Sequence, residues 1–257
     1  MNASPLAGRR ILVTRARHQA GKLSEGLRSL GAEPVEVPVI EIQPPSDFAP
    51  LDRALRQLDS YDWLILTSAN TVRALADRAA SLGLGLNAAT HLNISAVGEA
   101  TAEAARRLGL AVALVPESYV AESLTESLAV QTRGKKVLLA RAAIARDVIP
   151  HALRTAGATV DVVDAYRNVM PASAPALLRD ALKKGIDAVA FTSSSSVTHL
   201  ADAAGKAGIA FPFAHVAAIS IGPITSKTLR DLGWEPVTEA SPSDVPGLLQ
   251  TIARALG

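Results

Sequence analysis

The feature that most constrains the fold is a repeat in which an apolar run ends in Thr-Ser and leads into a helical pattern. Residues 188–197 (AVAFTSSSSV) have this form, and residues 63–72 (WLILTSANTV) have it 125 positions earlier (188 minus 63). Short apolar runs are typical of strands buried in a parallel sheet, and a Ser or Thr after them is typical of a helix start. The repeating unit is therefore a strand whose carboxyl end feeds a helix.

Other matches follow in the same order along the chain. Residues 134–141 (GKKVLLAR) match residues 8–15 (GRRILVTR) at an offset of 126 (134 minus 8), and Gly222 matches Gly98 at an offset of 124 (222 minus 98). The offset between matching residues thus falls from 126 through 125 to 124. One-residue loop deletions within an internal duplication produce such a change. The pattern predicts two halves, each an α/β, flavodoxin-like, doubly wound parallel sheet.

The expected elements alternate between strands and helices. Residues 9–14 read as a strand, the pattern of Leu23 and Leu27 as a helix, and residues 34–42 as a second strand. The Leu51, Leu55 and Leu58 pattern, residues 99–108 and residues 121–130 read as helices, and residues 63–66, 91–97 and 111–115 as strands. The second half repeats this order of strands and helices.

Composition narrows the class of protein. Of 257 residues, 49% are hydrophobic and only 4% aromatic, so the core consists of Ala, Leu, Val and Ile. The absence of cysteine excludes disulfides and thiolate catalysis. No apolar run reaches the length of a membrane span, and the first ten residues lack the apolar stretch of a signal peptide. We expect a cytoplasmic protein that does not bind a membrane.

The sequence lacks the residue patterns that several kinds of catalysis and cofactor binding require. The five histidines are scattered without metal-ligand spacing, and neither a phosphate loop nor a nucleophile elbow occurs. Gly83 and Gly85 imitate a dinucleotide fingerprint, but they follow a helix and are better read as its terminating loop. The 26 basic and 24 acidic side chains form no basic run, which argues against nucleic acid as a partner. We expect no cofactor and no metal.

Hydrogen-bond donors are instead abundant where strands end. Hydroxyls, an amide and free helix N–H groups together bind carboxylates or phosphates. Capping of the following helix is the alternative for each Ser or Thr. Gly98 and Gly222 serve either as turn glycines or as points where a ligand approaches the backbone. The side chains concerned are Thr67, Ser68, Asn70, Thr192, Ser193 and Ser195.

Two arginines and one tyrosine complete the candidate site. Arg15 and Arg141 follow the first strand of each half, where they can pair with carboxylates, although a solvated surface position is the alternative. Tyr166 breaks the symmetry, because its counterpart at an offset of 126 (166 minus 40) is Ile40. A phenol here either packs in the core or donates a proton.

An ordered set of motifs runs through the chain. The motifs are Val13-Thr-Arg15, Glu41-Ile42 with the prolines that follow, Asp62 to Asn70, Ala96 to Thr101, Val163 to Arg167, Phe191 to Ser193 and Ile221 to Thr225. Each motif alone is weak, but the set, in its order and spacing over essentially the whole chain, resembles the uroporphyrinogen-III synthase family.

The resemblance implies a bilobal protein in which the chain crosses twice between the lobes. Lobe 1 would combine residues 1–38 with 168–257, and lobe 2 would hold residues 43–163. The crossings would fall near residues 37–42 and 163–169, as a two-stranded ladder. We expect a monomer.

The resemblance also implies a reaction and a site. The family cyclises the linear tetrapyrrole hydroxymethylbilane to uroporphyrinogen III, with loss of water and inversion of ring D, and uses no cofactor; such an enzyme is a lyase. Tyr166 matches the family tyrosine that assists departure of the hydroxyl group. The substrate-binding set would be Thr14, Arg15, Thr67, Ser68, Asn70, Val97, Gly98, Thr101, Arg141, Thr192, Ser193, Ser195, Gly222 and Thr225.

A second hypothesis needs no catalysis. A bilobal module that binds a polycarboxylate and reports it to a partner requires the same donors. Such a module would bind the tetrapyrrole but would leave the ratio of product isomers unchanged.

Overall fold

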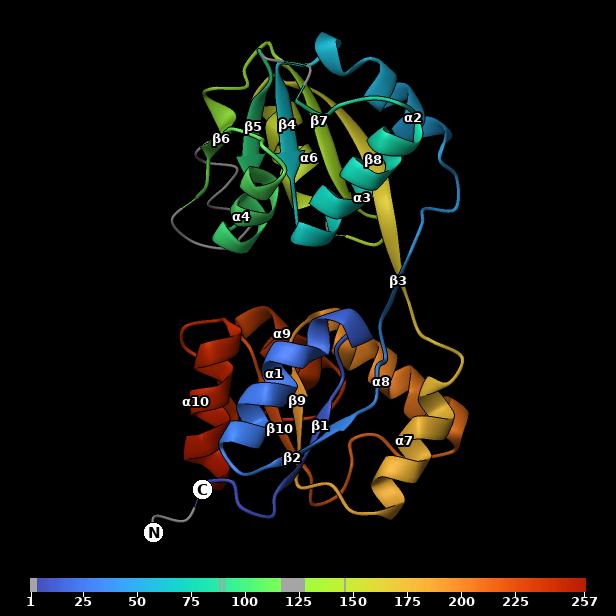
Figure 1. Ribbon diagram of the computed structural model, residues 1–257, viewed down its shortest axis with the longest axis vertical. Helices are drawn as coiled ribbons and strands as arrows, with labels where there is room; N and C mark the ends of the chain where they lie inside the picture. The colour runs from blue at the N-terminus through green and yellow to red at the C-terminus, as the bar shows by residue number, and fades with distance from the viewer. Residues whose placement is uncertain (1–3, 88, 90, 117–127, 146) are drawn as a thin grey trace. The chain divides into compact units, whose positions relative to one another are not determined.

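The computed structural model describes residues 4–87, 89, 91–116, 128–145 and 147–257 (Figure 1). The chain divides into two compact units. Unit 1 comprises Met1–Glu41 and Val169–Gly257, and unit 2 comprises Ile42–Asn168. The chain therefore leaves unit 1 once and returns to it once.

Unit 1 is built on a five-stranded sheet with the strand order β11-β10-β9-β1-β2. All neighbouring strands pair in parallel. The central strand β9 is wholly buried, as its continuous apolar sequence predicts. The bounds are β1 (Arg10–Val13), β2 (Glu33–Glu36), β9 (Ala188–Phe191), β10 (Ala217–Ser220) and β11 (Thr238–Glu239).

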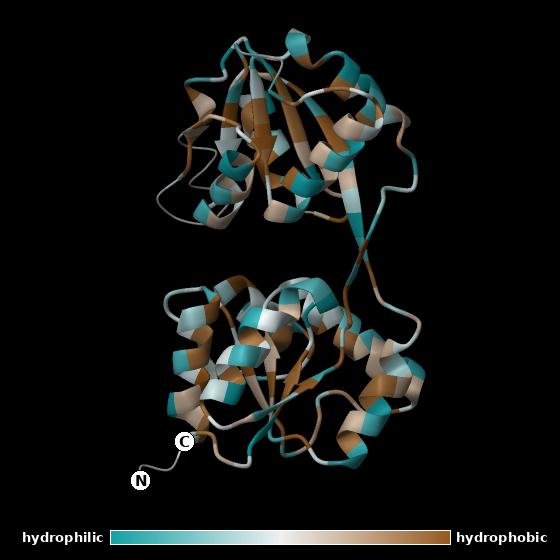
Figure 2. Ribbon diagram, viewed as in Figure 1, coloured by the Kyte–Doolittle hydropathy of each residue, from teal (hydrophilic) through white to brown (hydrophobic). Residues whose placement is uncertain are grey.

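Helices cover both faces of this sheet, because successive side chains of a strand point to opposite faces. Ile11 and Val13 pack against α1 and α10, whereas Leu12 faces α7, α8 and α9. Figure 2 shows the inner strands of this sheet mainly brown and the helices with mixed colours, as this layering requires. The bounds are α1 (Arg17–Ser29), α7 (Ala174–Lys183), α8 (Ser194–Ala207), α9 (Pro223–Asp231) and α10 (Val245–Leu256).

Unit 2 is built on a six-stranded sheet with the order β3-β8-β7-β4-β5-β6. The strands from β8 to β6 pair in parallel. The register of β7 against β8 shifts between Arg141 and Ala142, beside Tyr166. The bounds are β3 (Glu41–Gln43), β4 (Trp63–Leu66), β5 (Asn93–Ala96), β6 (Val112–Leu114), β7 (Lys136–Ala142) and β8 (Thr159–Val169).

The helices of unit 2 also lie on both faces of the sheet. Leu64 and Leu66 of β4 pack in the cluster that holds α2, α3 and α4, and Trp63 and Ile65 in the cluster that holds α6. The bounds are α2 (Ala49–Arg56), a 3-10 turn (Leu58–Ser60), α3 (Ala69–Ser81), α4 (Glu99–Arg107) and α6 (Val148–Thr155). None of the helices in the described ranges is long and apolar enough to cross a membrane.

The expected single strand over residues 34–42 is wrong. It is two strands, β2 and β3, which belong to different sheets. Between them the backbone N–H groups of Val37 and Val39 still bond to the end of β1 at Val13 and Thr14, but Pro38 has no N–H to continue a ladder.

Two other expectations concern helix ends. The Gly83 loop ends α3, and Gly83 adopts a φ of 71°, as a terminating glycine does. The helix expected over residues 121–130 lies mostly outside the described residues.

Candidate functional site

Three neighbouring strands of unit 1 bring predicted site residues to one edge of the sheet. Since β1, β9 and β10 run in parallel, their carboxyl ends meet there. Arg15 follows β1, Thr192 and Ser193 follow β9, and Gly222 follows β10. The structure thus brings these three chain segments to the same edge of the unit 1 sheet.

Not every hydroxyl at this edge is exposed. Thr14 is fully buried, and its Oγ1 donates to the main-chain oxygen of Ala190 at 3.3 Å. Thr225, in the first turn of α9, is only 4% exposed. These two hydroxyls lie within the packed interior, and the one of Thr14 ties β1 to β9.

Arg15 has a distinctive environment. Its side chain is half-buried, and burial lowers the pKa of the guanidinium from its ordinary value. Among the residues that the structure describes, none holds this guanidinium by a hydrogen bond or an ion pair. A partly desolvated cation with no counter-ion in the described part of the chain is suited to a carboxylate ligand.

Ser193 serves as the N-cap of α8. Its Oγ accepts from the N–H of Ser196 at 3.2 Å, and Ser196 Oγ donates to the main-chain oxygen of Ser193 at 2.6 Å. Capping, the alternative that the sequence left open, therefore accounts for Ser193. Thr192 and Ser195 stay half-exposed beside this cap.

Unit 2 gathers a second set where β4 ends. Ser68 is the N-cap of α3, and its Oγ accepts from the N–H of Thr71 at 3.1 Å. Thr67 Oγ1 donates to the main-chain oxygen of Ala140 in the neighbouring strand β7 at 3.1 Å. Thr67, Ser68 and Asn70 are all half-buried, so they stand at the boundary between core and solvent.

Tyr166 belongs to the same set. It lies in β8 and is 6% exposed, with its ring in the core cluster that contains Leu66 and Ala140. Its hydroxyl oxygen lies 3.1 Å from Ser68 Oγ. The ring thus packs in the core, as one of the two alternatives from the sequence has it, and the hydroxyl contacts a strand-end serine. Proton donation by this hydroxyl stays a prediction.

Arg141 differs from its repeat counterpart Arg15. It lies within β7, its side chain is 14% exposed, and its Nη1 donates to Asp147 Oδ1 at 2.7 Å. Asp147, by contrast, is 77% exposed. Arg141 is thus paired with a protein carboxylate through one of its guanidinium nitrogens.

The two predicted site glycines start helices. Gly98 and Gly222 are the N-caps of α4 and α9, with φ angles of −165° and 170°. These angles are extended, so neither residue is a turn glycine in the left-handed region. A Cβ on Gly222 would lie 2.7 Å from Ser243 Oγ, so the chain itself approaches closely there. Near Gly98, Val97 is half-buried and Thr101 is 6% exposed.

Sequence reasoning missed some polar residues beside these caps. Thr71 and Ser196 are the third residues after the two capping serines, and both are fully buried. Thr228 Oγ1 donates to Ser194 Oγ at 2.9 Å and thereby joins α9 to α8. The spacing of a capping box would have revealed Thr71 and Ser196. In the described ranges, no group of three or more His, Asp or Glu side chains could hold a metal ion.

Fold and site together define an α/β protein with parallel sheets whose strand ends carry hydroxyls and arginines. The model of a protein family described as uroporphyrinogen-III synthase HemD matches residues 21–250. The chain belongs to the uroporphyrinogen-III synthase family. Its role is accordingly in tetrapyrrole biosynthesis, as a lyase.

Relatives and solved structures agree on this family. The chain is 35% identical to the uroporphyrinogen-III synthase of Synechococcus elongatus, over 98% of this chain and 97% of that protein. It is 31% identical to a putative uroporphyrinogen-III synthase of Methanothermobacter thermautotrophicus, over 89% and 91%. A crystal structure of a mutant uroporphyrinogen III synthase from the extremely thermophilic bacterium Thermus thermophilus is similar with a TM-score of 0.69 at 23% identity, over 97% of this chain and 99% of that one. That last likeness shows the fold.

Proposed function

We propose that this chain converts hydroxymethylbilane to uroporphyrinogen III, with loss of water and inversion of ring D. The observation that carries this proposal is the hydrogen bond between Tyr166 and Ser68 at the carboxyl end of β4. It brings a proton donor to the strand-end hydroxyls that a substrate with many carboxylates requires. The full-length match to enzymes of this name supports the same reaction.

The protein's main task is to select the product. Loss of the hydroxyl group leaves a reactive cation that closes to an uninverted ring without help, so the enzyme must hold the chain in the geometry that favours inversion. Positioning supplies such selectivity. We assign Arg15, Thr192, Ser195 and Asn70 to carboxylate binding, because their side chains are half-buried at strand ends. Thr14, Thr101 and Thr225 would act by supporting these neighbours, since they are buried.

We also propose that the two units derive from one duplicated flavodoxin-like sheet. When the strands of unit 1 are numbered along the chain, β2-β1-β9-β10-β11 reads 2-1-3-4-5, the flavodoxin-like order. The strands β8-β7-β4-β5-β6 of unit 2 have the same order when β7 counts as the first.

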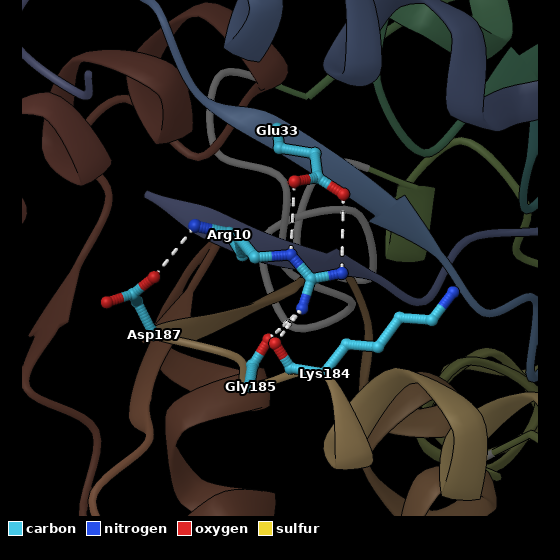
Figure 3. A network of polar contacts seen from close by, with 5 residues as sticks. All are labelled: Arg10, Glu33, Lys184, Gly185 and Asp187. Atoms are coloured by element: carbon cyan, nitrogen blue, oxygen red, sulfur yellow. Dashed lines mark hydrogen bonds and ion pairs between the residues drawn. The ribbon is translucent and has the colours of Figure 1, made fainter. Parts of the chain in front are cut away.

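Matching hydrogen bonds support the duplication. Asp187 accepts from the main-chain N–H of Arg10 at 2.8 Å (Figure 3), and Asp62, at an offset of 125 (187 minus 62), accepts from that of Lys136 at 2.8 Å. The other oxygens of the two carboxylates accept from Arg9 at 3.1 Å and from Lys135 at 3.2 Å. Equivalent residues thus make equivalent bonds in both units.

The remaining features of the organisation are proposals too. We assign the crossings to residues 37–42 and 163–169 as a two-stranded ladder, and the division of the chain at Glu41 and Asn168 supports this. Lobe 1 would then hold residues 1–38 and 168–257, and lobe 2 residues 43–163. We also propose a cytoplasmic monomer whose partner is the linear tetrapyrrole alone.

The test supplies freshly made hydroxymethylbilane to the purified protein and separates the isomers of the oxidised product. Type III product above the level of the spontaneous reaction is expected. Type I product alone would contradict the proposal. Binding of the tetrapyrrole without a change in the isomer ratio would favour the non-catalytic module, which the match to named enzymes does not favour.

A further inference from the structure

Four hydroxyl groups of unit 2 form a continuous hydrogen-bonded chain. Tyr166 Oη lies 3.1 Å from Ser68 Oγ, which lies 3.0 Å from Thr71 Oγ1. Thr71 Oγ1 in turn lies 3.2 Å from Thr67 Oγ1, and Thr67 donates to the main-chain oxygen of Ala140 at 3.1 Å. The chain therefore ends at a group that only accepts hydrogen bonds.

That end fixes the direction of every hydrogen bond in the chain. A hydroxyl has a single proton to give, so Thr67, which donates to Ala140, must accept from Thr71. By the same reasoning, Thr71 accepts from Ser68, and Ser68 accepts from Tyr166. The phenol proton of Tyr166 therefore points at Ser68 Oγ.

Burial decides whether a ligand reaches Ser68 or Tyr166 first. Tyr166 is 6% exposed with its ring in the core, and Thr71 is fully buried. Ser68 is half-buried where β4 ends and α3 begins. A molecule at the strand end meets the hydroxyl of Ser68 before that of Tyr166.

Helix capping alone does not require this chain, as unit 1 shows. Ser193 caps α8 as Ser68 caps α3, but the third residue, Ser196, donates to the main-chain oxygen of Ser193. The sequence counterpart of Tyr166 in that half is Ile40, which has no hydroxyl. The continuous chain of hydroxyls therefore occurs in the unit that has the tyrosine.

We propose that Ser68 passes the phenol proton of Tyr166 to the leaving hydroxyl group of the substrate, and that Thr71 is a positioning residue for Ser68. This inference rests on the proposed function. Thr71 holds Ser68 in two ways, because its N–H donates to Ser68 Oγ and its own Oγ1 accepts the serine proton in the resting chain.

The proton transfer balances as follows. In the reacting complex, the Ser68 hydroxyl turns its proton from Thr71 Oγ1 to the substrate. The O–H bond of Ser68 then breaks, and its proton joins the hydroxyl oxygen of the substrate. The carbon–oxygen bond of the hydroxymethyl group breaks, its electron pair leaves with water, and a cation remains on the tetrapyrrole. The proton of Tyr166 moves to Ser68 and leaves a phenolate. Ring closure forms a carbon–carbon bond and releases one proton from carbon, which returns through Ser68 to the phenolate.

A double-mutant cycle tests the relay. If Ser68 and Tyr166 act as one unit, Ser68→Ala and Tyr166→Phe each lower kcat about ten-fold, and the double variant lies within about two-fold of either. Restoration of kcat by Ser68→Thr is expected as well. Two effects that multiply to about a hundred-fold would mean that the residues act separately, and full activity of Ser68→Ala would also overturn the relay. Should Ser68→Ala not fold, Ser68→Gly removes the same hydroxyl and keeps a residue that helix starts tolerate.

The role of Thr71 has a matched control in the same unit. Thr71→Val removes a buried hydroxyl, and we expect kcat to fall about three-fold or more with KM unchanged, since only proton delivery is affected. Thr132→Val removes another fully buried hydroxyl, which donates to the main-chain oxygen of Leu128, and kcat should stay the same. Thr71→Ser should restore the rate. Equal losses in the two valine variants, or no loss in Thr71→Val, would overturn the positioning role.

The relay and the proposed function fail in different ways. If the wild-type protein yields only type I product, the proposed function is wrong. If it yields type III product but the effects in the double-mutant cycle multiply, only the relay is wrong.

Discussion

At the scale of single residues, Tyr166 and Arg15 carry the most specific chemistry. Tyr166 places a phenol hydroxyl beside Ser68 although its ring is packed in the core. Arg15 keeps a partly desolvated guanidinium, whereas its counterpart Arg141 is bonded to Asp147. Two arginines at matching positions of the sequence thus have different environments.

Tyr166→Phe should lower turnover about ten-fold or more, because the variant lacks the proton donor. The ring still fills its place in the core, so the fold should remain. Steady-state kcat and far-ultraviolet circular dichroism measure the two effects. Unchanged turnover would leave Tyr166 with a packing role only.

Arg15→Leu should raise KM by roughly ten-fold or more, as expected when a hydrogen bond between two charged groups, worth about 1.5–3 kcal/mol, is lost. Its melting temperature should not fall, because the substitution removes a charge that burial disfavours. Arg28→Leu serves as control, since Arg28 is exposed in the last turn of α1. An unchanged KM in Arg15→Leu would argue against a carboxylate at this residue.

At the scale of elements, each sheet is tied at its amino edge by an aspartate. Asp187 precedes β9 and bonds to the start of β1, and Asp62 precedes β4 and bonds to the start of β7. In unit 1, Arg10 adds two bonds to Glu33 of β2 and others to the main chain at Lys184 and Gly185 (Figure 3). These contacts lie at the opposite edge of each sheet from the candidate site residues and tie neighbouring strands together there.

Asp62→Asn should destabilise unit 2 at neutral pH. The hydrogen bond from the main-chain N–H of Lys136, followed by that from Lys135, lowers the pKa of the Asp62 carboxyl from its ordinary value. The ionised carboxylate therefore stabilises the fold above the unfolded pKa of about 3.9, and this contribution is lost as pH falls through the lower folded pKa. The melting temperatures of wild type and variant should differ at pH 7 and converge towards pH 3. A difference as large at pH 3 as at pH 7 would contradict this origin.

At the scale of the whole molecule, each unit has its own core on both faces of its own sheet. The two tryptophans are divided between them, because Trp63 lies in β4 and Trp234 packs against Phe191, Phe211 and Phe213. Chains with two cores commonly depart from two-state unfolding. Fluorescence therefore reports on each unit separately.

Leu200→Ala should destabilise unit 1 by about 2–5 kcal/mol, because Leu200 of α8 is fully buried. In urea unfolding, the Trp234 transition of the variant, observed in a Trp63→Phe background, should move to lower urea. The Trp63 transition, observed in a Trp234→Phe background, should move much less. Equal shifts of both transitions would mean that the units unfold as one.

The sequence by itself predicted the α/β kind of fold and the strand ends at which the candidate site residues lie. Apolar runs that end in Thr-Ser predicted β4 and β9 with the helices after them, and the repeat offset predicted which residues correspond. These features are local, because buried strands and helix caps leave their marks within a few residues. The ordered motifs likewise identified the family before the fold was known.

Only the tertiary structure decided how these residues are used. It split residues 34–42 between two sheets, since the local pattern of an apolar strand does not say which sheet it joins. It paired Arg141 with Asp147 and left Arg15 without a counter-ion among the described residues. It also joined Tyr166 to Ser68, 98 positions apart. Such pairings depend on how parallel strands are ordered in a sheet, and distant residues become neighbours only when the sheet forms.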